Sequence, residues 1–295
     1  MDEDLIIPDP TITVRKCQSW EDFITVIRRE SFDARLFRGH RDVRWRLSSA
    51  FERTLVGIKK YDPEQITFSR EIIHTAREEY WERFYQLALG LPGLPNAMSP
   101  NDWWILGRHY GLVTPLLDWS GSPYVAAFFA FVDHLESRYS SLKDGLGGIG
   151  LIDVKNDGES VAIWALSTER LIRKKEELQI IYPETEFSVH SQRIRAQKSV
   201  FTKMEHSRYI DIESYLRSEG LFDCLRRYEI PGTEAIKALR DMELMNISFA
   251  TLFPDLHGAA KQANLGRTIS MLNAYLFGLD RADTTNDQRS ADSAE

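Results

Sequence analysis

The residues best suited to chemistry stand in one short stretch, Leu36-Phe37-Arg38-Gly39-His40, where an arginine ends an apolar run and a glycine follows it. The apolar pair is typical of a strand, and Gly39 would permit a tight turn or the close approach of another backbone. The guanidinium of Arg38 offers a planar fork of donors that suits a phosphate, a diphosphate or a carboxylate. The stretch therefore predicts an anion pocket, with an internal ion pair between Arg38 and Asp118 or another carboxylate as the alternative.

A second segment, between His109 and Pro123, places several polar side chains between apolar flanks. Asp118 would be costly to bury without donors, so we expect it to be paired, hydrogen-bonded or functional. Trp119 would stack on a flat base or ring, or pack as an ordinary core residue. Ser120 stands just before a predicted helix start, where the helix amides would hold an anionic group unless the next serine simply caps the helix.

Four further residues are candidate ligand contacts. His109 and Tyr110, at a predicted helix end, would present an acid-base group and a phenol to the same pocket, or His109 would only cap the helix. Arg193 and Gln197 are four residues apart and would share one helical face, which suits joint contact with a ligand or with Asp118. Gln197 would hydrogen-bond a ribose hydroxyl or an amide, or else cap the backbone of the following strand.

These segments together resemble the FRG domain family, which is named for its Phe-Arg-Gly motif. The matching blocks are Phe37-Arg38-Gly39, Leu116-Leu117-Asp118-Trp119-Ser120, Arg193-Ile194-Arg195-Ala196-Gln197-Lys198-Ser199-Val200-Phe201-Thr202 and Thr251-Leu252-Phe253-Pro254-Asp255-Leu256-His257-Gly258. The resemblance covers about Ser19 to Gln262, with Pro115 where the family commonly has arginine and Ser199 where it commonly has glycine. It implies a bacterial or phage-related setting, such as stress or phage defence, and no particular reaction.

Capping residues and apolar periodicity predict the elements that would position these side chains. Helices are predicted from Ser19, from Asp62 to about Leu89, from Asn101 to Gly111, from Ser122, from Thr233 to Met242 and from Leu256 to Leu279. Strands are predicted near Ile12–Val14, around Phe37, at Ile149–Val154 with Val161–Trp164 as a hairpin neighbour, and at Leu178–Ile181, Val200–Thr202 and Cys224–Ile230.

This order of elements predicts an α+β fold, with a central mixed or antiparallel sheet flanked by several helices in a single compact domain. We expect residues 19–279 to form this domain, residues 1–18 to be an N-terminal extension, and residues 280–295 to be a disordered acidic tail. Asp255 is expected to cap the last helix, with Leu252, Phe253 and Leu256 packing beneath it.

The composition excludes several classes of function. The net charge is −7, so there is no strong case for nucleic acid as a partner. Two cysteines, no signal peptide and no membrane-spanning apolar run predict a cytoplasmic protein with no membrane contact. Zinc-finger spacing, a Walker A loop, a dinucleotide fingerprint and a Gly-x-Ser-x-Gly elbow are all absent from the sequence, so no metal site and no serine nucleophile are expected.

Three functional hypotheses remain. The first is an enzyme that uses NAD as its substrate, because the layout resembles in outline the arginine-serine-glutamate arrangement of ADP-ribosyltransferases. The second is a sensor or binding module for a nucleotide, another phosphorylated small molecule or a partner protein. In the third, the same polar residues only form a buried network that specifies the fold.

The enzyme hypothesis gives each residue a role. Arg38 would grip the diphosphate, Trp119 or Tyr110 would stack on nicotinamide, and Ser120 would orient the ribose. Cleavage of the glycosidic bond develops positive charge on the ribose, so a nearby carboxylate would stabilise it. Gln197 stands where that carboxylate is expected, and Asp118 is its substitute, with Glu205 nearby.

Overall fold

A computed structural model describes residues 12–30, 35–57, 70–92, 94, 98–144, 159–171, 177–183, 191–205 and 209–272. These residues form a seven-stranded mixed sheet with helices packed on it, which confirms the predicted α+β fold in one compact domain. The strands are β1 (Thr13–Lys16), β2 (Arg35–His40), β3 (Leu116–Ser120), β4 (Ser160–Ser167), β5 (Leu178–Ile181), β6 (Ser199–Met204) and β7 (Leu225–Pro231).

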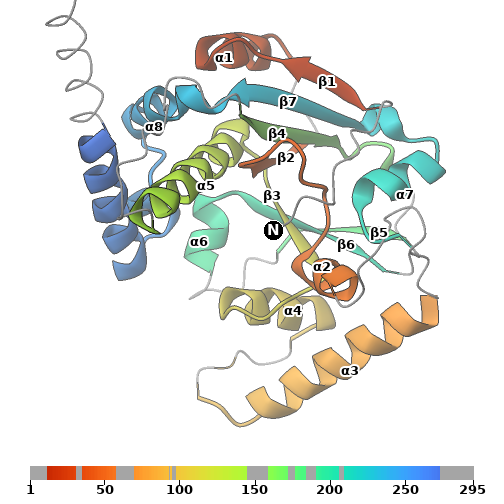
Figure 1. Ribbon diagram of the computed structural model, residues 1–295. Coiled ribbons are helices and arrows are strands. Elements are labelled where there is room, and N and C mark those ends of the chain that lie inside the picture. Colours follow the sequence, from red (N-terminus) through yellow and green to blue (C-terminus); the bar gives the residue numbers. More distant parts are fainter. Residues whose placement is uncertain are drawn as a thin grey trace, which may run out of the picture.

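The helices precede, separate and follow these strands (Figure 1). They are α1 (Trp20–Arg29), α2 (Ala50–Gly57), α3 (Arg70–Ala88), α4 (Pro100–His109), α5 (Pro123–Asp144), α6 (Ser191–Ala196), α7 (Ile212–Ser218), α8 (Ala235–Leu244) and α9 (Phe249–Leu252), the short 3-10 turns η2 (Phe222–Cys224) and η3 (Gly232–Glu234), and a last helix over residues 256–272. No helix in this part of the chain is long and apolar enough to cross a bilayer.

The sheet has the strand order β1-β7-β4-β2-β3-β6-β5. Only the β1–β7 pair is parallel, and the other neighbours are antiparallel. β2 pairs with β4 along its whole length, whereas β2 and β3 are paired at a single position, Phe37 opposite Ser120. The two strands therefore separate beyond this pair and leave a fork in the middle of the sheet.

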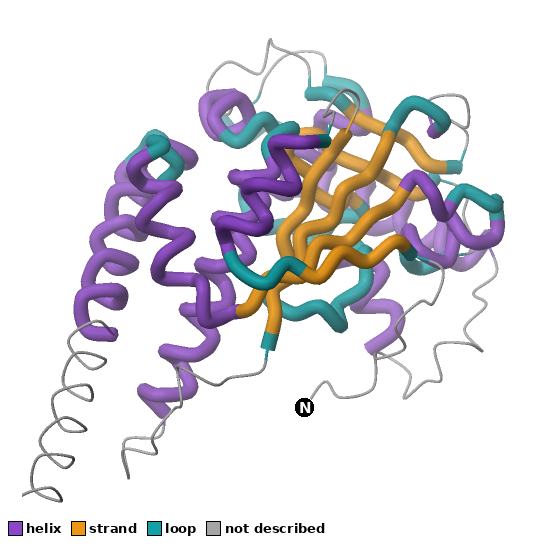
Figure 2. The backbone as a smooth tube through the Cα atoms, turned by 90° about the horizontal axis from the view of Figure 1, so that it is seen from above, coloured by secondary structure: helices purple, strands orange, loops and turns teal. Residues whose placement is uncertain are grey.

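Helices cover both faces of the sheet (Figure 2). On one face α1, α5 and α8 bury a core that includes Trp20, Phe37 and Phe131. On the other face α7 packs over Trp119 and Trp164. The part of the sheet that contains β3 and β6 is covered by α4, so α4 and α5 lie on either side of the fork.

Local signals in the sequence account for most of these elements. The Ser19 side chain accepts from the Asp22 amide and begins α1, and Ser122 does the same for Val125 in α5. The predicted hairpin neighbour 149–154, the helix start at Asp62 and the tail 280–295 lie outside the described residues. β4 pairs instead with β2 and β7, and β1 adds a strand to the sheet before residue 19.

The segment that follows β2 is anchored on α7 by two buried acidic residues. The carboxylate of Glu213 accepts the backbone N–H of Leu47 at 2.9 Å, and Asp211 pairs with Arg46 at 2.9 Å. The hydroxyl of Ser48 also donates to the carbonyl of Ile210 at 2.7 Å. These bonds hold the chain at the point where it enters α2.

Replacing Glu213 with glutamine is expected to remove a pH dependence of stability. Burial, and then the neighbouring charge of Asp211, raise the pKa of the Glu213 carboxyl from 4.5 to about 8. Between these pH values the folded chain holds a proton that the unfolded chain has released. The free energy of unfolding of the unaltered chain therefore falls as the pH rises, by up to about 1.4 kcal/mol per pH unit.

Urea unfolding at about pH 5.5 and about pH 7.5 measures this fall. The E213Q variant should lose less stability between the two conditions than the unaltered chain, because an amide does not titrate. Glu136, an exposed residue of α5, supplies the matched control E136Q, which should follow the unaltered chain. Parallel curves for E213Q and the unaltered chain would show that Glu213 does not hold the extra proton.

Candidate functional site

A cavity of about 440 Å³ lies over the fork between β2 and β3. Figure 1 shows α4 and α5 on opposite sides of this region, with α6 between them. Its walls come from β2, β3, β6, α4, α5, α6 and the residues that follow α6 and α9. They include Arg38, Gly39, Arg108, His109, Asp118, Trp119, Ser120, Phe129, Arg193, Ile194, Gln197 and Phe253. Eight of the nine predicted site residues line this cavity, all but Tyr110, although the side chain of Trp119 points to the opposite face of the sheet.

Arg38 spans the fork between the separated strands. Its Nη1 donates to the carbonyl oxygen of Asp118 at 2.7 Å and lies 3.5 Å from a carboxylate oxygen of the same residue. Because β2 and β3 are not paired here, the Asp118 carbonyl would lack a backbone donor, and the guanidinium supplies one. The predicted meeting of Arg38 and Asp118 at one cavity is present in the structure.

His40 supports the other side of the Arg38 side chain. The Arg38 Nε lies 3.0 Å from His40 Nε2, and the indole Nε1 of Trp164 lies 3.2 Å from His40 Nδ1. Burial, and then the charge of Arg38, hold the pKa of His40 well below its usual value. The imidazole is therefore neutral. A neutral imidazole has a single acceptor nitrogen, whereas both the Arg38 Nε and the Trp164 Nε1 face it as donors.

Asp118 is held mainly by a residue that the sequence analysis missed, Arg108. The Nε and Nη2 of Arg108, in the last turn of α4, donate to the two carboxylate oxygens of Asp118. Burial would raise the pKa of this carboxyl, but the charge and hydrogen bonds of Arg108, with the charge of Arg38, lower it below its usual value. Asp118 is thus an ionised acceptor whose side chain is 36% exposed.

A third arginine, Arg53 of α2, adds to the positive charge at this site. Burial, and then the charges of Arg108 and Arg53 against that of Asp118, lower the pKa of Arg38 to about 10, so its guanidinium stays protonated at neutral pH. Glu52, the other carboxylate that acts on Arg53, is itself paired with Arg77. Three guanidinium groups therefore act on one ionised carboxylate, and an excess of positive charge remains.

Gly39 is required for packing rather than for a turn. It lies within β2, opposite Ile163, and its Cα faces the backbone of α5 at Ala126. Of the two roles predicted for this glycine, the structure has the close approach of another backbone. The approach brings α5, and with it Phe129, to the edge of the cavity.

Ser120 and Gln197 join β3 to the end of α6. The hydroxyl of Ser120 donates to the carbonyl of Gln197 at 2.6 Å and accepts from the amide of Ser122 at 3.0 Å. The side-chain amide of Gln197 donates to the carbonyl of Leu252 at 3.1 Å. Gln197 thus bonds the backbone of α9, not the strand that follows it, and lies on the cavity wall.

Arg193 pairs with Asp255, and not with Asp118, which its spacing to Gln197 suggested as a shared partner. Its Nε donates to Asp255 at 2.7 Å, and its Nη2 bonds the same carboxylate oxygen. Asp255 also caps the last helix by accepting from the amide of Gly258 at 2.9 Å, as predicted. Leu256, by contrast, is exposed and does not pack beneath that helix.

The aromatic residues proposed for stacking are not placed for it. The Trp119 side chain is 3% exposed, and its Nε1 donates to the hydroxyl of Thr202 at 2.8 Å on the face that α7 covers. Tyr110 is 69% exposed and does not line the cavity, although its ring contacts that of His109, which does. Side chains alternate along β3, so Asp118 and Ser120 face the cavity while Trp119 faces away.

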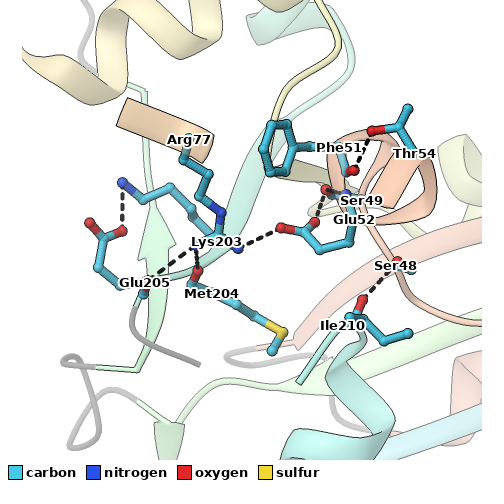
Figure 3. A network of polar contacts seen from close by, with 10 residues as sticks. All are labelled: Ser48, Ser49, Phe51, Glu52, Thr54, Arg77, Lys203, Met204, Glu205 and Ile210. Carbon is cyan, nitrogen blue, oxygen red and sulfur yellow. Dashed lines mark hydrogen bonds and ion pairs between the residues drawn. The ribbon is translucent and has the colours of Figure 1, made fainter. Parts of the chain in front are cut away.

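A buried network beside the site fixes α2, the helix that carries Arg53 (Figure 3). Glu52 pairs with Arg77 of α3 at 2.5 Å and also bonds the hydroxyl of Ser49. Arg77 donates to the backbone carbonyls of Met204 and Glu205 at the end of β6. One ion pair thus ties together α2, α3 and the sheet.

Comparison with known families identifies the segment that carries this site. Residues 33–138 match the model of the FRG domain, and they include β2, α2, α3, α4, β3 and most of α5. The chain therefore carries an FRG domain, whose Phe37-Arg38-Gly39 motif and Asp118 meet at the cavity. The later stretches around Arg193 and Thr251 lie outside the matched range, and no curated protein or solved structure matches the chain.

Proposed function

We propose that this FRG domain binds a nucleotide-type anionic ligand in the cavity above the fork. The observation that carries the proposal is the clustering of Arg38 and Arg108 on one carboxylate, Asp118, at the wall of a space of about 440 Å³. A phosphate group suits two guanidinium groups that are already oriented by a fixed anion. The charge excess supports an anionic ligand over a neutral one.

The geometry favours binding without turnover. Cleavage of NAD needs a carboxylate beside the ribose, because positive charge develops there. Among the residues that line the described cavity, Asp118 is the single carboxylate, and Arg108 engages both of its oxygens. Gln197 is neutral and its amide is bonded to Leu252. A sensor or binding module therefore fits this arrangement better than an ADP-ribosyltransferase-like enzyme does.

NAD cleavage is the second candidate function, and one observation favours it. The lowered pKa of Asp118 keeps its carboxylate ionised, and the side chain remains partly exposed. An anionic ligand that binds Arg108 would break its ion pair with Asp118, and the Asp118 carboxylate would then be free to face the ligand. Asp118 would then be the catalytic carboxylate, and no metal ion would be involved in the step.

Replacing Arg38 with glutamine is expected to weaken ligand binding by roughly 10- to 150-fold, from the loss of a charged hydrogen bond worth ~1.5–3 kcal/mol. Isothermal titration calorimetry with ADP and with NAD measures the effect. Arg44 supplies a matched control, R44Q, because it lies a few residues away and pairs with Asp42 on the surface. R44Q should bind as the unaltered chain does.

The same samples separate the two candidate functions. Nicotinamide released from NAD by the unaltered chain, and not by D118N, would establish the enzyme. Binding of ADP or NAD with no release would establish the binding module. If neither nucleotide binds, or if R38Q binds them as well as the unaltered chain does, the proposed function is wrong.

A further inference from the structure

The part of the cavity formed by α6 and the end of α9 contains a flat, rigid cation. The guanidinium of Arg193 is held along one edge by Asp255, and its Cζ lies 5.1 Å from the centre of the Phe253 ring. That ring is itself fixed edge-to-face against Phe129, with the centroids 6.1 Å apart. The guanidinium is therefore held between a carboxylate and an aromatic ring while it lines the cavity.

A supported guanidinium plane is a surface on which an aromatic base can stack. Arginine is weakly hydrated and planar, and it stacks on flat rings in the way that aromatic side chains do. The ion pair with Asp255 leaves Arg193 with little net charge to offer an anion. Arg193 is thus better suited to a ring than to a phosphate, in contrast to Arg38 and Arg108.

Gln197 lies beside this surface with its orientation fixed. Its amide nitrogen bonds the carbonyl of Leu252, so the carboxamide is held in one plane. The carboxamide oxygen has two lone pairs and can accept from an exocyclic amino group or a ring N–H of a base. Ile194, on the same helix as Arg193, supplies apolar contact on the same wall.

The spacing along β3 relates this surface to the anion site. Asp118 contacts the arginine pair, and Ser120, two residues further on, bonds the carbonyl of Gln197. Two residues of an extended strand span about 7 Å, which leaves room for a sugar between a phosphate and a base. The anion site and the Arg193 surface are thus connected through β3, at two positions that lie on the same face of the strand.

We propose that Arg193, Phe253 and Gln197 form a base subsite, in which the ring of a nucleotide stacks on the Arg193 guanidinium and Gln197 bonds its edge. This inference rests on the proposed function and deepens it: the ligand carries an aromatic base, and is not a sugar phosphate or a free phosphate. The subsite replaces Trp119 and Tyr110 as the place where a ring would stack. It lies outside the segment that matches the FRG domain model.

Titration of the R193K variant with ADP and with pyrophosphate tests the subsite. Lysine keeps the positive charge but not the plane, so R193K should bind ADP roughly 5- to 150-fold more weakly, the factor that corresponds to ~1–3 kcal/mol of stacking per base. Its affinity for pyrophosphate should stay within about twofold of the unaltered value, because that ligand has no ring. R195K, at an exposed position of the same helix, is the matched control.

The outcomes separate this inference from the proposed function. If the unaltered chain binds neither ADP nor pyrophosphate, the proposed function fails. If it binds both, and R193K weakens neither or weakens both equally, the base subsite is overturned while the anion site stands. If R193K does not fold, D255N tests the same point, because asparagine still caps the helix but releases the edge of the guanidinium. Undiminished ADP binding by D255N would then overturn the subsite.

Discussion

The G39A variant is expected to be destabilised by about 3 kcal/mol or more, at or above the usual cost of overpacking. A methyl group at this position would overlap the carbonyl oxygen of Ala126 and lie 2.9 Å from the Cβ of Ala130. The first contact is with the backbone of α5, which cannot turn aside as a side chain does. The strand and the helix would have to separate, and the cavity between them would lose its shape.

Thermal and urea unfolding measure this cost, with G121A as the matched control. Gly121 directly follows β3, and a methyl group there would meet its nearest atom, the Cβ of Lys198, at 3.6 Å, an ordinary contact. G121A should therefore remain close to the unaltered chain. The A126G substitution should not rescue G39A, because the overlap is with the main chain. A G39A variant as stable as the unaltered chain would mean that β2 and α5 are not packed this closely.

The R77M variant is expected to lose about 3–5 kcal/mol of stability, the usual cost of leaving one member of a buried ion pair alone. Without Arg77, the buried carboxylate of Glu52 would either stay charged with no partner or take up a proton, and both states cost stability. Burial already raises the pKa of Glu52, against the charge of Arg77. The loss in R77M should therefore be smaller at low pH, where protonation of Glu52 costs less.

Two comparisons isolate the buried pair. The double variant with E52Q and R77M should be more stable than R77M alone, because it leaves no uncompensated charge. The R170M variant removes a pair with Asp223 whose side chains are 54% and 68% exposed, and it should change stability by no more than about 0.5 kcal/mol. Equal losses in R77M and R170M would show that burial does not set the energy of the Glu52–Arg77 pair.

The elements that the sequence predicts are those with signals inside the element. Ser19 and Ser122 each predict a helix start, and in the structure each side chain accepts a hydrogen bond from a backbone N–H in the first turn of that helix. The apolar run around Phe37 predicts the strand. The close approach of another backbone was one of the two roles predicted for Gly39. The eight-residue α2 was missed, because its position is set by the contact of Glu52 with a distant arginine.

The site was predicted in part for the same reason. Arg38 and Asp118 stand out locally, because each is a charged residue among apolar ones, and the structure brings them together. Arg108 was missed, since nothing in α4 alone says that its last turn lies against β3. The strand β3 itself was not predicted, and only once it is known does alternation along it put Trp119 on the opposite face from Asp118.

Because β2 and β3 are paired at a single position, the sheet consists of two parts that meet at one seam, the boundary between these strands. At this seam the Arg38 side chain supplies a hydrogen bond to the Asp118 carbonyl where a backbone N–H would otherwise donate. A ligand that draws the Nη1 of Arg38 away from the Asp118 carbonyl also removes this cross-strand bond. Cohesion of the seam and occupancy of the cavity are then linked, and each changes the free energy of the other by the same amount. On the proposed function, the arginine of the Phe-Arg-Gly motif would bind the ligand, and it also joins the two strands through its bond to the Asp118 carbonyl.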